Sequence, residues 1–140
     1  MKYKIVRNKD YLHRKTEPVL SIEEGEAIAK QLTEALDELQ FGIGLSAIQI
    51  GIPKAVSIVR AKKDKPAIIL MNPVVTEHSK EKIIYLEGCL SIPGKQVSTV
   101  RSQKVTVVTM NHANPLSFGP DVEPMTQESV PTDYGLLECI

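Results

Sequence analysis

The sequence predicts an α+β fold in which one long helix packs on small, mainly antiparallel β-sheets. Two observations lead to this fold class. Residues 22–40 repeat apolar side chains at helical spacing, and most of the chain beyond Gly51 consists of short β-branched segments between turn-forming residues. A length of 140 residues is typical of one domain, so we expect residues 1–140 to form a single domain.

The helix predicted over residues 22–40 has a start signal and a buried face. Ser21 and Glu24 have the spacing of a capping box, in which each side chain bonds the backbone of the other residue. Apolar residues then recur at steps of three and four, at Ile28, Leu32, Ala35, Leu36 and Leu39. Phe41-Gly42 is expected to end the helix.

Short segments after the helix are expected to be strands. They are Ala55–Val59, Ala67–Leu70, Val74–Glu77, Lys82–Leu86, Gln96–Val100 and Val105–Met110. Sequences such as Asn72-Pro73, His78–Glu81 and Pro93-Gly94 are expected to separate them as turns. In Val105–Met110 both alternating sets contain apolar residues, so either face could be buried. Residues 111–132 contain several prolines and are expected to be loop with one edge strand, and residues 133–140 to start a second helix.

Composition excludes several kinds of protein. A net charge of zero gives no electrostatic reason to expect a nucleic-acid partner, so we expect no DNA binding. The chain has no apolar run of about 18 residues, so we expect no membrane span. Nothing accompanies the two cysteines to suggest secretion, and we therefore expect reduced thiols and a cytoplasmic protein.

Two stretches contain residues suited to chemistry. Cys89, in Glu87-Gly88-Cys89-Leu90-Ser91, could be a small buried residue or a thiolate metal ligand. A thiolate beside the backbone N–H of Leu90 would suit a metal hydrolase, in which the metal activates water and the N–H stabilises an oxyanion. Gln49, in an apolar run, could pair with backbone at a strand edge or donate its carboxamide to the same oxyanion.

Together, these stretches resemble the first two motifs of the peptide deformylase family. Gly42-Ile43-Gly44-Leu45-Ser46-Ala47-Ile48-Gln49 resembles the first motif, although Ser46-Ala47-Ile48 stands where Ala-Ala-Pro is usual. Residues 87–91 match the second motif residue for residue, and the spacing of the two motifs fits. The resemblance implies a metal-dependent hydrolase that removes the formyl group from N-formyl-methionine of nascent polypeptides and releases formate. It also implies Fe²⁺, with Zn²⁺, Ni²⁺ or Co²⁺ as substitutes.

The resemblance implies roles for individual residues. Cys89 would be a metal ligand, Gln49 and the N–H of Leu90 would hold the formyl oxygen, Ile43, Gly44 and Gly88 would bind the peptide, and Glu87 would pair with Arg101 behind the site. Ile43 would line the methionine pocket. Further implied partners are the N-formyl-Met nascent peptide and the ribosome exit region, in a bacterial, organellar or virus-infected bacterial cell.

The third motif of the family, His-Glu-x-x-His, does not occur in these 140 residues. The three histidines, His13, His78 and His112, lack metal-ligand spacing, and we expect each to be exposed or locally hydrogen-bonded. Gly135-Leu136-Leu137 resembles the opening of the helix that carries the third motif. We therefore expect a compact, C-terminally incomplete deformylase domain that by itself binds metal weakly and has little activity.

Two alternatives remain open. The chain could be a non-catalytic module that binds formyl-Met peptides or the ribosome, using Gln49, Gly88 and Leu90 without a metal. It could also be a thiol hydrolase with Cys89 as nucleophile, although no histidine is an obvious base for it.

Overall fold

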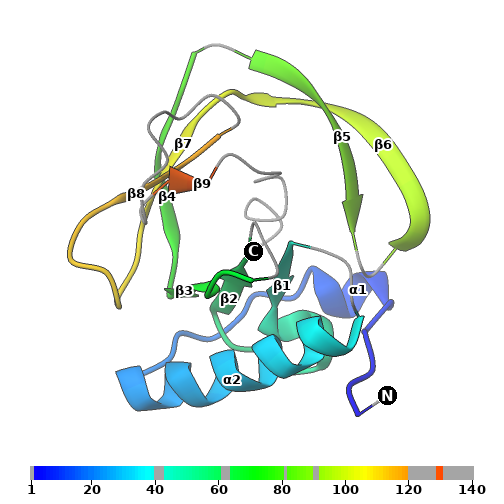
Figure 1. Cartoon of the computed structure of the whole chain (residues 1–140), viewed down its shortest axis with the longest axis vertical. Helices are drawn as coiled ribbons and strands as arrows, with labels where there is room; N and C mark the ends of the chain where they lie inside the picture. The colour runs from blue at the N-terminus through cyan, green and yellow to red at the C-terminus, as the bar shows by residue number, and fades with distance from the viewer. Residues whose placement is uncertain are drawn as a thin grey trace.

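The α+β class is confirmed by the computed structural model (Figure 1). The structure describes residues 2–39, 43–60, 64–80, 82–89, 92–119 and 129–130, and only the backbone for 82–89, 92–101 and 129–130. The elements are α1 (Lys9–Leu12), α2 (Ile22–Leu39), β1 (Gly44–Ser46), the 3₁₀-helix η1 (Ala47–Ile50), β2 (Val56–Val59), β3 (Ile68–Met71), β4 (Val74–His78), β5 (Lys82–Cys89), β6 (Ile92–Ser102), β7 (Val105–Val108), β8 (Leu116–Phe118) and β9 (Ser129–Val130).

Three small sheets make up the β part of the described chain. β1-β2-β3 form an antiparallel sheet, β5 pairs with β6 in an antiparallel ribbon, and β4-β7-β8-β9 form a sheet that is antiparallel except for the β8–β9 pair. Figure 1 shows α2 running beneath β1-β2-β3, with the β5–β6 ribbon on the far side of that sheet. The mainly antiparallel pairing expected from the sequence is confirmed.

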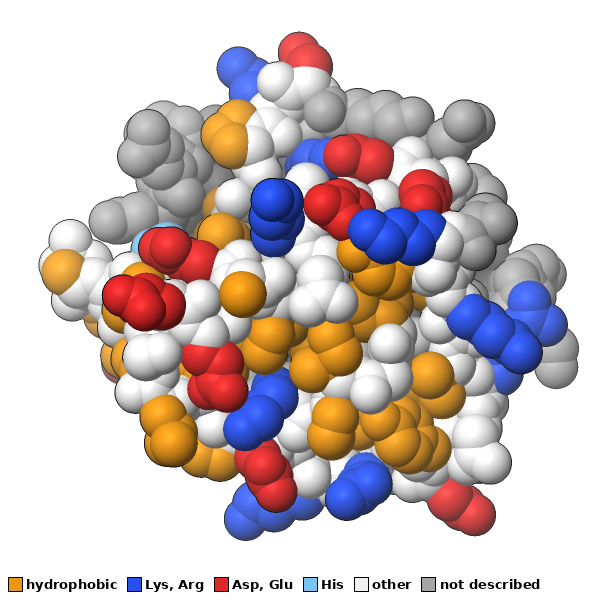
Figure 2. Space-filling view, turned by 90° about the horizontal axis from the view of Figure 1, so that it is seen from below, with side chains coloured by type: hydrophobic (Ala, Val, Ile, Leu, Met, Phe, Trp, Pro, Cys, Tyr) orange, Lys and Arg blue, Asp and Glu red, His pale blue; other side chains and the backbone are white. Residues whose placement is uncertain are grey.

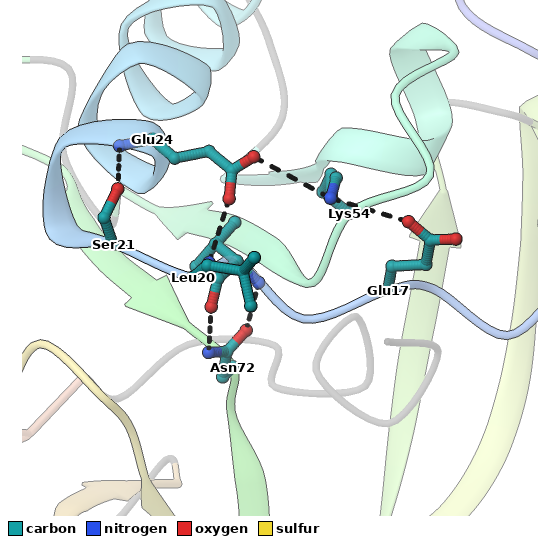
Figure 3. Close-up of polar contacts among 7 residues, drawn as sticks. Glu17, Leu20, Ser21, Glu24, Lys54 and Asn72 are labelled. Atoms are coloured by element: carbon teal, nitrogen blue, oxygen red, sulfur yellow. Dashed lines mark hydrogen bonds and ion pairs between the residues drawn. The ribbon is translucent and has the colours of Figure 1, made fainter.

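The start of α2 is held by side chains from several segments (Figure 3). The Ser21 hydroxyl accepts a hydrogen bond from the Glu24 N–H at 3.1 Å, as the predicted capping box requires. The Glu24 carboxylate accepts from the N–H of Leu20 at 2.9 Å, one residue earlier than a standard box. Lys54 lies 3.7 Å from the same carboxylate, which links the helix start to the segment before β2.

The buried face of α2 packs on the β1-β2-β3 sheet. Ile28, Leu32, Ala35 and Leu36 are buried as predicted, and Leu39 is half-buried. Their cluster includes Leu45, Val56, Ile58 and Met71 from the strands. A second cluster lies between the sheets and contains Val59, Leu70, Val105, Val107, Leu116 and Phe118. The set Val105, Val107 and Thr109 is therefore the buried face of the β7 segment.

The structure corrects several boundaries. Pro93-Gly94 was expected to be a turn between strands but lies inside β6. Gly88 pairs with Gln96 and Cys89 with Ile92, so residues 93–95 fall within an irregularity of the ladder, where a proline that lacks an N–H is tolerated. His78 was expected in a loop but ends β4, paired with Val105. In addition, α1, β1 and η1 were not predicted.

The segment 111–132, expected as loop with one edge strand, holds β8 and β9 in the described part. β8 is not at the edge, because it lies between β7 and β9. The helix start predicted at 133–140 lies outside the described residues. Among the helices that can be described, none has the length and apolar character needed to cross a membrane.

The N-terminal arm, which precedes α1, is hydrogen-bonded to α2. The Tyr3 hydroxyl donates a 2.7 Å hydrogen bond to the Glu34 carboxylate, and this bond lowers the pKa of Glu34 and raises the pKa of Tyr3. Further along the arm, the Val6 N–H donates to the Gln49 carbonyl oxygen at 2.7 Å. Figure 2 views the molecule from the α2 side, where apolar side chains gather among acidic and basic ones.

Gly25 provides a test of the close packing of α2 on β3. A Cβ at this position would overlap the side chain of Met71, which is 1% exposed. We expect Gly25→Ala to lower the free energy of unfolding by about 1–3 kcal/mol through overpacking. In an exposed helix position, the same change would raise it by up to about 1 kcal/mol. Urea unfolding measures the difference, with the exposed Glu26→Ala as control. A stabilised Gly25→Ala would contradict the close approach.

Candidate functional site

The segment from Ile43 to Gly51 forms a strand followed at once by a tight helical turn. β1 pairs with β2 through Gly44↔Val59 and Ser46↔Ser57. Ser46 keeps an extended backbone (φ −106°, ψ 153°) and is the N-cap of η1. Gly51 ends the turn with φ 86°, a left-handed conformation in which glycine has no steric penalty. The predicted site residues Ile43, Gly44 and Gln49 therefore lie on one continuous segment.

The alternation of hydrogen bonds in β1 determines where its backbone groups point. The Arg60 N–H donates to the Ile43 carbonyl oxygen at 2.6 Å, so residues 43 and 60 form a hydrogen-bonded pair. In an antiparallel ladder such pairs alternate with non-bonded ones, which makes Gly44↔Val59 and Ser46↔Ser57 non-bonded pairs. The backbone N–H and C=O groups of Gly44 and Ser46 consequently point away from β2. β1 is an edge strand of the sheet as described.

The Gln49 side chain folds back onto this edge. Its Oε1 accepts hydrogen bonds from the Ser46 backbone N–H at 3.0 Å and from the Ser46 hydroxyl at 3.1 Å. The 3₁₀ geometry favours this contact, because residues three apart lie one above the other. Gln49 is 7% exposed and Ser46 is 9% exposed. The interpretation of Gln49 as a glutamine that pairs with backbone at a strand edge is confirmed, and it is compatible with a donor role for the NH₂ group.

An ion pair between Arg60 and Asp37 stabilises the position of the same segment. Arg60 follows β2, and its guanidinium lies 2.6 Å from the Asp37 carboxylate of α2. Arg60 is 8% exposed, whereas the Asp37 side chain is 58% exposed. A charge that is buried must be paired, so this contact holds the end of β2, and with it Ile43, against the helix.

The first three residues of the second predicted motif, Glu87 to Cys89, end β5. Gly88 and Cys89 are the last residues of β5, and in the view of Figure 1 the arrowhead of β5 points toward the part of the fold that holds β1 and α1. Leu90 lies outside the described residues. Glu87 pairs in register with Val97 and Arg101 pairs with Ile83, so their backbones are four positions apart along the ribbon. The predicted Glu87–Arg101 ion pair stays a prediction.

Comparison with known proteins relates this geometry to a family. A family model described as polypeptide deformylase matches residues 2–115. A peptide deformylase of Natranaerobius thermophilus is 40% identical over 115 residues, which are 79% of this chain and 72% of that protein. One of Finegoldia magna is 32% identical over 132 residues, 92% of this chain and 74% of that protein. The crystal structure of a probable peptide deformylase from synechococcus phage S-SSM7 matches with a TM-score of 0.69 and 33% identity, covering 77% of this chain and 76% of that one.

The chain belongs to the polypeptide deformylase family. It is thus a hydrolase by family, and this family is metal-dependent. The resemblance drawn from the two sequence motifs is confirmed.

The residues that can be described do not by themselves fit the metal centre of a polypeptide deformylase. They contain no group of three or more His, Cys, Asp or Glu side chains that could share an ion. His13 caps α1, His78 ends β4, and the His112 ring nitrogen Nε2 lies 2.8 Å from the Ile69 carbonyl oxygen. The expectation of exposed or locally bonded histidines is confirmed. For Cys89 only the backbone position is described.

Ser46 bonds the predicted site residue Gln49, and this role of Ser46 was not predicted from the sequence. Its signal was present, because Ser46-Ala47-Ile48-Gln49 has the Ser-x-x-Gln spacing of a capping box, and the two residues form that box at η1. The short apolar run around it gave no helical periodicity, so the turn itself was not predicted.

Gln49→Leu tests the structural part of this contact. Leucine keeps the approximate volume but removes the acceptor of two buried donors of Ser46. We expect the free energy of unfolding to fall by about 1–3 kcal/mol, as measured by urea denaturation. The exposed Gln31→Leu on α2 is the control and should change it by about 0.5 kcal/mol or less. Equal stability of the two variants would argue against the Ser46–Gln49 contact.

Proposed function

We propose that the chain acts in hydrolysis of the formyl group from N-formyl-methionine of nascent polypeptides, with release of formate. One observation carries the proposal: in a member of the deformylase family, a buried glutamine next to an edge strand has its oxygen bonded by Ser46. The NH₂ end of the carboxamide is then oriented to donate. A fixed donor of this kind stabilises an oxygen on which negative charge develops. In the proposal, Gln49 and the N–H of Leu90 bind the formyl oxygen.

The backbone groups of β1 that point away from β2 are the proposed contacts for an extended peptide, although all three residues of β1 are buried in the structure. Gly44 directs its N–H and C=O away from β2 and has no side chain to keep a partner strand at a distance. A peptide could add to this edge by main-chain hydrogen bonds, which are independent of its sequence. Gly88 would contribute backbone from β5, and Ile43 would contact the methionine side chain. This mode of binding fits an enzyme that accepts many nascent chains.

Cys89 is the proposed metal ligand of this chain. Further ligands would come from a His-Glu-x-x-His helix, which the 140 residues do not contain. Fe²⁺ is the proposed metal, with Zn²⁺, Ni²⁺ or Co²⁺ as substitutes. The proposed setting is the cytoplasm, where N-formyl-Met peptides emerge from the ribosome exit region.

The proposal is tested by formate release from an N-formyl-Met tripeptide. Two proteins are compared under anaerobic conditions with Fe²⁺: the 140-residue chain, and the same chain extended after Ile140 by a designed helix that carries His-Glu-x-x-His. We expect formate release only from the extended protein. Cys89→Ser should reduce the rate by about 100-fold or more, because even partners of metal ligands contribute 10- to 100-fold. Cys139→Ser is the matched control and should leave the rate unchanged.

Other outcomes separate the alternatives. Activity that survives Cys89→Ser would refute the role of Cys89. Activity that is lost on alkylation but persists with a chelator would indicate a thiol hydrolase. If the extended protein binds the tripeptide without metal and releases no formate, the chain is a binding module and the proposal is wrong.

A further inference from the structure

We propose that Ser46 is a positioning residue whose hydroxyl holds the Gln49 carboxamide in its donating orientation. This inference rests on the proposed function. It goes beyond that function by assigning a role to the Ser46 side chain, which bonds the Gln49 oxygen.

The oxygen end of the Gln49 carboxamide faces Ser46. A backbone N–H can only donate, so the group 3.0 Å from the Ser46 nitrogen must be the oxygen of Gln49. The NH₂ group lies in the same plane, on the other side of Cδ from the oxygen, and therefore points away from the Ser46 nitrogen. This choice does not depend on how oxygen and nitrogen are assigned in the side chain, because the reverse assignment would place two donors against each other.

The Ser46 hydroxyl limits the rotation of the Gln49 carboxamide. A single hydrogen bond determines which end faces the backbone but permits rotation of the carboxamide about its last torsion, which is broad in glutamine. The Ser46 hydroxyl donates to the same oxygen at 3.1 Å from a different direction. Two donors on one oxygen restrict that rotation. The hydroxyl thus contributes to the direction in which the NH₂ group points.

A second serine, Ser57, lies directly opposite Ser46 in the β1–β2 ladder. Ser57 is 1% exposed, and its hydroxyl has no hydrogen-bond partner in the described structure. The two serines share residue type, burial and place in the sheet, but only Ser46 contacts Gln49. Ser57→Ala is therefore a matched control for the loss of a buried hydroxyl.

The test compares wild type, Ser46→Ala, Ser46→Thr and Ser57→Ala. The first readout is the exchange of the Gln49 side-chain NH₂ protons with water by NMR in the ¹⁵N-labelled 140-residue chain, assigned by their absence in Gln49→Leu. We expect Ser46→Ala to accelerate this exchange about tenfold, because it removes the hydroxyl bond to the carboxamide oxygen. Ser46→Thr, which keeps the hydroxyl, should restore slow exchange, and Ser57→Ala should not change it. If Ser46→Ala fails to fold, Ser46→Cys, with a weak donor, takes its place.

The second readout is the rate of formate release by the extended protein. A misdirected oxyanion donor loses stabilisation of the transition state, so we expect Ser46→Ala to lower kcat about 3- to 10-fold, less than the 10²–10³ for losing a whole donor. KM should change less than about twofold, because main-chain bonds to Gly44, and not the Ser46 hydroxyl, are proposed to hold the peptide.

The two readouts keep the proposals distinguishable. Faster NH₂ exchange in Ser46→Ala together with a wild type that releases no formate would refute the proposed function and leave the orienting contact standing. Formate release with Ser46→Ala indistinguishable from Ser57→Ala in both exchange and kcat would refute the positioning role of Ser46 and leave the proposed function standing.

Discussion

The pair of hydrogen bonds from Ser46 to the Gln49 oxygen is the interaction on which the candidate site depends. It satisfies a backbone N–H that the alternation of β1 directs away from its only neighbour strand in the described sheet. It also folds η1 against the end of β1 and brings the buried glutamine beside the edge formed by Gly44. One local contact thus meets a structural need and orients a group suited to catalysis.

The rest of the fold holds this turn in place. The buried face of α2 supports β1 and β2 through Leu32 and Leu36, and Gly25 permits a close approach to Met71 of β3. Arg60 ties the end of β2 to Asp37. In the N-terminal arm, the Val6 backbone N–H donates a hydrogen bond to the Gln49 backbone carbonyl oxygen. Because these contacts come from elements far apart in sequence, the geometry of the turn depends on the whole packed core.

This dependence explains what could be predicted from the sequence. The helix over residues 22–39 has capping and periodicity in its own sequence, and β2, β3 and β4 have β-branched runs. The predicted β5 and β6 were too short. Gly88, Pro93 and Gly94 are typical turn residues, so the local sequence predicts that the strands end there. In the structure, these residues lie within the paired strands. β1 and η1 are too short for periodicity, and only tertiary contacts define them. The motif residues predicted the family. The hydrogen bonds between Ser46 and Gln49 could not be predicted from the sequence and are seen only in the folded structure.

The hydrogen bond from the Ser46 backbone N–H to the Gln49 oxygen fixes which end of the carboxamide can donate. It is tested most directly by the NMR scalar coupling that passes through a hydrogen bond, between the Ser46 backbone nitrogen and the Gln49 side-chain Cδ in the doubly labelled chain. A resolvable coupling between these two nuclei is the expected result. A coupling of the Ser46 nitrogen to a backbone carbonyl carbon in its place would contradict it, since the Ser46 N–H would then not bind the carboxamide oxygen.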